Sequence, residues 1–73
     1  MKTTFTISLE KASEAYDAIT DNRLLEENLI NDYPNVWIVE AENPTKQIEL
    51  VEELINQLAL FGILLGQYEV SNE

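Results

Sequence analysis

The apolar residues of this chain repeat with two different periods, and the change between them indicates the fold class. From Thr3 to Leu9 apolar and polar residues alternate, which is typical of a β-strand with one buried face. From Glu10 the apolar residues recur every three or four positions, which is typical of an amphipathic helix, and its expected inward stripe is Ala12, Ala15, Tyr16 and Ile19. We therefore expect an α+β domain whose first strand leads directly into a helix that ends at Thr20-Asp21-Asn22.

The second half of the chain repeats this order of strand and helix. Val36 to Ala41 begins with four consecutive β-prone apolar residues, which predicts a central strand buried on both faces. Asn43 and Pro44 match an N-cap and the first position of a helix, and Gly62 is well placed to end it. A last strand is expected over Leu64–Val70. The expected inward face of the helix consists of Ile48, Val51, Leu54, Ile55, Leu58 and Phe61.

Residues 23–33 fit two alternatives. The run Leu24-Leu25-Glu26-Glu27 favours a short helix, which Asp21 could cap, whereas the turn signal at residues 31–35 favours the end of a strand. The helix gives the order β-α-(α)-β-α-β, a two-layer fold with a three-stranded sheet and two or three helices on one face. The strand gives βαββαβ, which is similar to the ferredoxin-like order of elements and implies no activity. Either order is one domain over residues 1–73.

The charge of the chain restricts its partners. Fourteen acidic residues stand against four basic ones, so that the net charge is −10 in 73 residues. This charge opposes direct binding to nucleic acid or to an anionic membrane, because both would repel it. No apolar stretch approaches the roughly 20 residues of a membrane span, and no apolar signal segment follows Met1-Lys2. We therefore expect a cytoplasmic protein without direct contact to nucleic acid or membrane.

The residue types also argue against catalysis. The chain has no histidine and no cysteine, which excludes the usual nucleophile pairs. Its two glycines, Gly62 and Gly66, flank a hydrophobic segment and do not form a phosphate-binding loop. The neighbouring carboxylate pairs are Glu40 with Glu42 and Glu52 with Glu53, and both lie on expected solvent faces; no calcium-loop spacing occurs. We expect no enzymatic activity, no cofactor and no metal site.

Two sets of carboxylates are candidates for binding a partner. The first set is the row Glu10, Glu14, Asp17 and Asp21, and the second set is Glu49, Glu52 and Glu53. Steps of three and four residues place each set on one helix face, where like charges repel one another. Such a row resembles the spaced phosphates that nucleic-acid-binding proteins hold. The alternative is that both sets are ordinary solvated helix faces.

Trp37 is the third candidate for a partner contact. If helices cover one face of the sheet, alternation leaves one part of the apolar run from Val36 on the uncovered face. That part is either Trp37, Val39 and Ala41 or Val36 and Ile38. Leu65 of the expected last strand would join them. Such a patch is typical of a dimer or partner interface, where tryptophan is enriched. The alternative is that Trp37 belongs to the core.

Together these features favour a non-catalytic binding protein with a basic protein partner. We expect an inhibitor whose acidic helical surface mimics nucleic acid and occupies the basic groove of an enzyme that acts on nucleic acid. Phage and mobile-element inhibitors such as anti-CRISPR and anti-restriction proteins share this physical character, although no motif here identifies such a family. The alternative is a structural or accessory subunit that oligomerises through its sheet face, for example as a homodimer.

Overall fold

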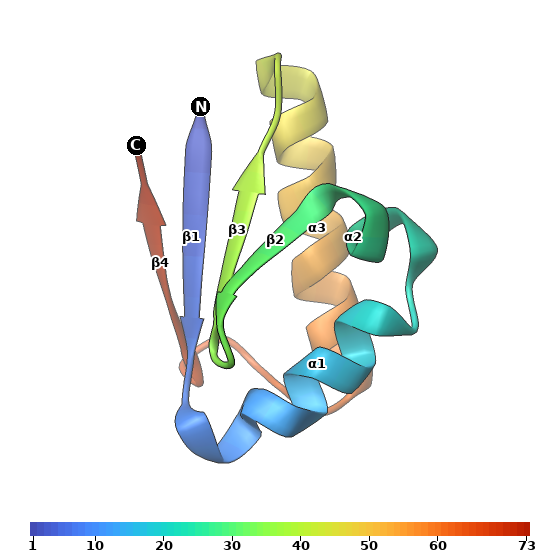
Figure 1. Ribbon diagram of the computed structural model, residues 1–73, viewed down its shortest axis with the longest axis vertical. Coiled ribbons are helices and arrows are strands. Elements are labelled where there is room, and N and C mark those ends of the chain that lie inside the picture. The colour runs from blue at the N-terminus through green and yellow to red at the C-terminus, as the bar shows by residue number, and fades with distance from the viewer.

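A four-stranded antiparallel sheet with helices packed on one face forms the protein, as the computed structural model shows for all residues 1–73 (Figure 1). The strands lie in the order β2-β3-β1-β4, and each neighbouring pair is antiparallel. The α+β class is therefore confirmed, but the sheet has four strands and not three. The elements are β1 (Lys2–Ile7), the 3₁₀ turn η1 (Leu9–Lys11), α1 (Ala12–Thr20), α2 (Arg23–Asn28), β2 (Leu29–Tyr33), β3 (Val36–Glu40), α3 (Pro44–Leu60) and β4 (Tyr68–Asn72).

The middle segment contains both of the alternatives that its sequence allowed. Residues 23–28 form α2, and residues 29–33 continue at once as β2, which pairs with β3 through an irregular register between Asn31 and Tyr33. The cap of α2 is Asn22 and not Asp21, because the Asn22 side chain accepts a hydrogen bond from the Leu25 amide at 3.2 Å. The order of elements is thus βαββαβ with the short helix α2 inserted before β2.

The core lies between the sheet and the helices. Alternation along β1 buries Phe5 and Ile7 as expected, but the strand ends at Ile7, and Leu9 begins η1 and is exposed. Burial of this apolar surface is the main favourable contribution to folding. The buried apolar residues are Phe5, Ile7, Ala15, Ala18, Ile19, Leu25, Trp37, Val39, Leu50, Leu54, Leu58, Ile63 and Tyr68.

Helix α3 has nearly the expected bounds but a different inward face. Asn43 caps it, since its side chain accepts a hydrogen bond from the Lys46 amide at 2.8 Å. Of the expected inward residues, Leu54 and Leu58 are buried and Val51 is half-buried, but Ile48, Ile55 and Phe61 are exposed. Gln47, Leu50 and Gln57 are buried in addition.

Two buried glutamines explain why α3 turns a different face toward the sheet. Gln47 Nε2 donates to Thr3 Oγ1 at 2.8 Å and to the Val39 carbonyl at 2.9 Å. Gln57 Nε2 donates to the Ala18 carbonyl at 2.9 Å. These hydrogen bonds satisfy the side-chain nitrogens of both glutamines, which lowers the cost of burying them, whereas Gln47 Oε1 is buried without a donor.

The segment before β4 is a loop and not the expected strand from Leu64. Gly62 has a φ of 81° and follows the end of α3, as expected, while Gly66 has a φ of 108°. The Gln67 amide donates to the Leu64 carbonyl at 3.0 Å, and the Gln67 side chain accepts from the Leu64 amide at 2.9 Å. This closed turn is incompatible with an extended chain. Leu65 therefore lies in the loop, and its expected place on the sheet face is wrong.

The uncovered face of the sheet carries Val36 and Ile38 rather than Trp37. Thr4 pairs with Ile38 and Thr6 with Val36, so these four side chains share the face opposite the core. Figure 1 shows β1 and β3 from a side on which no helix overlies them. Ile30 of β2 pairs with Ile38 and extends this apolar strip to the edge of the sheet. No helix has both the length and the apolar character to cross a membrane.

Candidate interaction surface

Trp37 belongs to the core, so its interpretation as an interface residue is wrong. Only 3 % of Trp37 is exposed, and its ring lies 6.2 Å from that of Tyr16 on α1, with 37° between the ring planes. Its indole Nε1 is buried and has no hydrogen-bond acceptor. The phase of β3 decides this placement, because Trp37 pairs with Phe5, whose side chain points to the helices.

The first acidic row lies on the surface of the first helical segment. Glu10 lies in η1, Glu14 and Asp17 lie on α1, and Asp21 follows the last turn of α1. All four side chains are exposed. Lys11 Nζ lies 3.3 Å from the Glu14 carboxylate and compensates the charge of one member of the row. Glu10, Asp17 and Asp21 have no ion-pair partner, so the row retains a strongly negative character.

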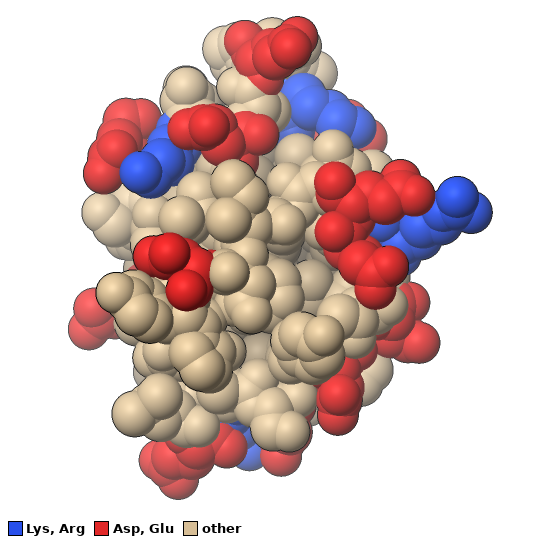
Figure 2. Space-filling view, viewed as in Figure 1, with Lys and Arg blue, Asp and Glu red and all other residues tan.

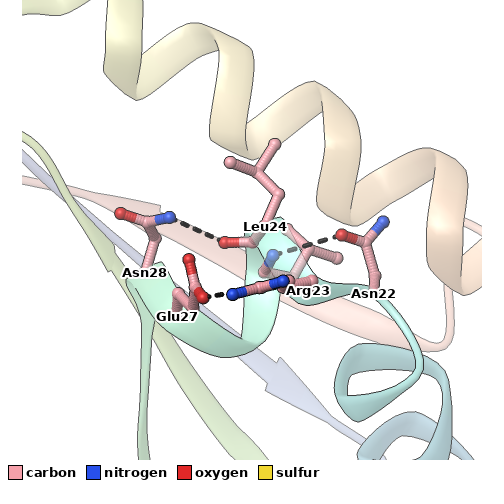
Figure 3. A network of polar contacts seen from close by, with 6 residues as sticks. Asn22, Arg23, Leu24, Glu27 and Asn28 are labelled. Atoms are coloured by element: carbon pink, nitrogen blue, oxygen red, sulfur yellow. Dashed lines mark hydrogen bonds and ion pairs between the residues drawn. The ribbon is translucent and has the colours of Figure 1, made fainter.

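The second acidic set is divided by the structure. Glu49 and Glu52 are exposed, but Glu53 is half-buried. The Glu53 carboxylate accepts a hydrogen bond from Asn22 Nδ2 at 2.7 Å, which joins α3 to the connection between α1 and α2. In Figure 3 the Asn22 side chain lies between the first turn of α2 and α3. Glu53 is therefore engaged in a contact within the protein, whereas Glu49 and Glu52 are exposed.

Most carboxylates have no cationic neighbour. Of the fourteen acidic side chains only Glu53 is not exposed. Three ion pairs use three of the four cations, which leaves eleven carboxylates unpaired. The pairs are Lys2–Glu73 at 3.6 Å, Lys11–Glu14 at 3.3 Å and Arg23–Glu27 at 2.9 Å. Figure 2 shows acidic side chains around much of the outline of one face, with an uncharged area in its middle.

A groove between α1 and the β2–β3 hairpin was not indicated by the sequence. Its volume is about 580 Å³. Three of its large apolar or aromatic side chains are strongly exposed, namely Leu9 at 74 %, Tyr16 at 51 % and Tyr33 at 65 %. The sequence pattern assigned Tyr16 to the inward stripe of its helix, and only the packing of α1 against the hairpin shows it at the surface. The groove is lined by Leu9, Ala12, Ser13, Tyr16, Asn31, Asp32, Tyr33 and Pro34.

Hydrogen bonds hold the hairpin wall of this groove. Asn31 Nδ2 donates to the carbonyls of Tyr33 at 2.6 Å and Val36 at 3.0 Å, which fixes the turn. Asn35 exchanges two bonds with Ile7 at the end of β1: its Nδ2 donates to the Ile7 carbonyl at 2.9 Å, and its own carbonyl accepts from the Ile7 amide at 2.8 Å. The opposite wall is held by the contact of Tyr16 with the buried Trp37 ring.

A second apolar surface lies on the loop after α3. Leu60, Leu64 and Leu65 are each 60 % or more exposed, and Phe61 is 39 % exposed. No charged residue occurs between positions 54 and 68. The loop differs in this respect from the groove, where the acidic side chain of Asp32 lies among the apolar ones.

The titratable groups offer little chemistry beyond charge. Nowhere do three or more carboxylates converge so that they could hold a metal ion. Burial raises the pKa of the Tyr68 phenol above its usual value near 10. The distinctive features of the surface are therefore its carboxylates, the groove and the apolar loop after α3. Comparison of the chain with protein-family models, with curated proteins and with solved structures gives no match.

The raised pKa of Tyr68 predicts a loss of stability in alkali. The phenol of the unfolded chain ionises near pH 10, whereas the folded protein holds the proton to higher pH, so the free energy of unfolding is unaffected below about pH 10 and falls above it. Tyr68→Phe keeps the ring contact with Phe5 and removes this contribution. The free energy of unfolding, measured with urea between pH 8 and pH 11, should fall more steeply with pH for the wild type than for the variant. Parallel curves would show that burial does not perturb the phenol.

Proposed function

We propose that this protein is a non-catalytic binding protein whose acidic surface occupies a basic groove of a partner that acts on nucleic acid. The observation that carries the proposal is the exposed row Glu10, Glu14, Asp17 and Asp21 on the first helical segment, on a surface where three of the four cations are already paired. A partner groove that binds phosphates would find exposed carboxylates in their place, two of which, Glu14 and Asp17, lie one turn apart on α1.

Competition for the groove would make the protein an inhibitor. Long-range attraction between its net charge of −10 and a basic groove would speed association, and the attraction would weaken as salt screens it. The backbone that carries the acidic row is already ordered in the free protein. Binding would therefore restrict mainly the carboxylate side chains themselves. Inhibition of the anti-CRISPR or anti-restriction kind is one form of this activity, with a cytoplasmic site of action where such enzymes meet their nucleic acid.

The test compares two variants that lose the same charge at different places. One carries Glu10→Gln, Glu14→Gln, Asp17→Asn and Asp21→Asn, and the control carries Glu26→Gln, Glu42→Gln, Glu69→Gln and Glu73→Gln, all at exposed positions. Immobilised wild type should retain a basic nucleic-acid-binding protein from its own cell extract at 50 mM salt, and added DNA should displace it. With that partner purified, the row variant should bind on the order of tenfold to a hundredfold more weakly, while the control changes little.

Two results would contradict the proposal. The first is an affinity for the purified partner that is the same at 50 and 300 mM salt, because charge mimicry requires screening. The second is an equal loss of affinity in the row variant and in the control, because only total charge would then matter. Circular dichroism of both variants at each salt concentration ensures that the comparison is between folded proteins.

The uncovered sheet face supports the alternative of a self-associating subunit. Ile30, Val36 and Ile38 form an apolar strip on this face, and Ile30 is 53 % exposed. Two copies meeting here would also bring two net charges of −10 together, so salt should strengthen the dimer. This is opposite to its effect on a basic partner. Sedimentation equilibrium at 50 and 500 mM salt, with Ile30→Lys as the disrupting variant, distinguishes the two functions.

A further inference from the structure

We propose that the groove between α1 and the β2–β3 hairpin is the docking site for a partner segment that carries an arginine beside an apolar side chain. The basic character of this segment rests on the proposed function, and the groove adds where the segment binds and which side chains it uses. Three properties of the groove support this assignment: its exposed rings, its acidic lining and its held walls.

The first property is a concave site with apolar and aromatic walls. The groove is open to solvent, and its volume of about 580 Å³ is large enough to receive a few side chains. Leu9 and Tyr16 stand on one wall and Tyr33 with Pro34 on the other, and the three largest of these are at least half exposed. An apolar side chain that enters between them would remove their surface from water on both sides. Aromatic residues in such positions commonly contribute most to the affinity of an interface.

The second property is the charge of the groove and of its border. Asp32 is the charged residue of the lining, and no lysine or arginine lines the groove. Ser13 on the α1 wall is four residues before Asp17, so one member of the acidic row, Asp17, lies beside the groove. A guanidinium group can pair with a carboxylate and stack on a tyrosine face at the same time, which an ammonium group does less well. The lining therefore favours arginine.

The third property is that both walls are held before a partner binds. Tyr16 rests on the buried Trp37 ring, and Asn31 and Asn35 fix the hairpin through their side-chain hydrogen bonds. Few groups must therefore be ordered on binding, which reduces the entropic cost.

Charge complementarity excludes the other occupants of this groove. A second copy of the chain would add fourteen acidic residues and only four basic ones to an already acidic site. A basic segment of another protein remains as the occupant that the charges attract.

The test uses three fluorescein-labelled twelve-residue peptides and two pairs of variants. One peptide alternates Arg-Leu with Ser-Gly, the second replaces Leu by Ser, and the third replaces Arg by Glu. Fluorescence anisotropy at 150 mM salt gives the affinities. The groove variants are Tyr33→Ser and Asp32→Asn, and the controls Ile48→Ser and Glu52→Gln make similar changes at exposed positions on α3. We expect the Arg-Leu peptide to bind about tenfold more tightly than the Arg-Ser peptide, and the Glu-Leu peptide not to bind.

The groove variants should remove most of that tenfold preference, and the α3 controls should retain it. Nuclear magnetic resonance of the ¹⁵N-labelled protein should place the largest shifts of the Arg-Leu peptide at residues 9–16 and 31–35. The single tryptophan, Trp37, lies beneath Tyr16 and gives an independent signal, since its emission should change with the Arg-Leu peptide alone.

The possible failures are distinguishable. If both arginine peptides bind equally and Tyr33→Ser has no effect, the groove proposal is overturned while a basic partner for the acidic row still stands. If the shifts map to residues 60–65 or to the uncovered sheet face, the docking site lies there and the groove proposal is again overturned. If neither arginine peptide binds, the groove proposal fails, and the affinity of the four-carboxylate variant for its partner then decides the proposed function independently.

Discussion

Replacing Trp37 with lysine is expected to unfold the domain rather than to change its oligomeric state. Truncation of a buried tryptophan costs about 3–5 kcal/mol in the free energy of unfolding, and a charge left among apolar residues costs several more. A domain of this size with no disulfide has roughly 3–5 kcal/mol in total. The loss therefore exceeds the available stability, since Trp37 is almost wholly buried between β3 and Tyr16.

Two measurements test this expectation. Far-ultraviolet circular dichroism and the dispersion of amide proton resonances should both show an unfolded chain for Trp37→Lys at 25 °C. Ile48→Lys, which introduces the same charge at an exposed position of α3, should remain folded. Trp37→Phe should fold with reduced stability because the ring contact with Tyr16 is partly kept. A folded Trp37→Lys protein would show that the residue lies outside the core.

Removing the side chain of Asn22 is expected to have the second largest effect, about 2 kcal/mol or more. Its Oδ1 caps α2 by accepting from the Leu25 amide, and an N-cap of this type contributes about 1 kcal/mol. Its Nδ2 donates to the Glu53 carboxylate at 2.7 Å, and hydrogen bonds to charged groups contribute about 1.5–3 kcal/mol. Asn22→Ala loses both, so its melting temperature should fall by about 10 °C or more.

A matched pair of substitutions separates the cap from the contact with Glu53. Asn22→Asp keeps the capping oxygen but places a second carboxylate against Glu53. Adding Glu53→Gln to that variant reverses donor and acceptor and should restore most of the lost stability. Urea unfolding of the single and double variants measures this coupling. If Glu53→Gln fails to restore stability to Asn22→Asp, the cap alone accounts for the role of Asn22, and the contact with α3 contributes nothing.

The elements that the sequence predicted well are those whose signals are local. Alternation identified β1, the β-prone run identified β3, and Asn43 with Pro44 identified the start of α3, because each depends on neighbouring residues only. The sequence of residues 23–33 did not predict a single type of secondary structure, because these eleven residues form a short helix and a strand in succession. Its strand pairs with β3, which follows after the two-residue turn at 34–35, and β3 is itself fixed by its pairing with the distant β1.

The inward face of α3 could not be predicted from its apolar pattern. Ile48 and Leu50 are both apolar and lie on different faces of the helix, so the apolar pattern allows either face to pack against the sheet. The partners of Gln47 and Gln57, which are the Thr3 hydroxyl, the Val39 carbonyl and the Ala18 carbonyl, decide the rotation, and they come from three other elements. The same limit applies to Glu53, whose exposure depends on the distant Asn22.

The sequence by itself determined the excess of carboxylates, the α+β class and the exposure of most acidic side chains, because charge and hydrophobic period are properties of the residues alone. Only the tertiary structure decided that Trp37 belongs to the core, that Glu53 is used internally, and that Leu9, Tyr16 and Tyr33 border one groove. The physical reason is that these properties depend on the phase of a strand or helix against its neighbours. Contacts between elements far apart in the chain set that phase.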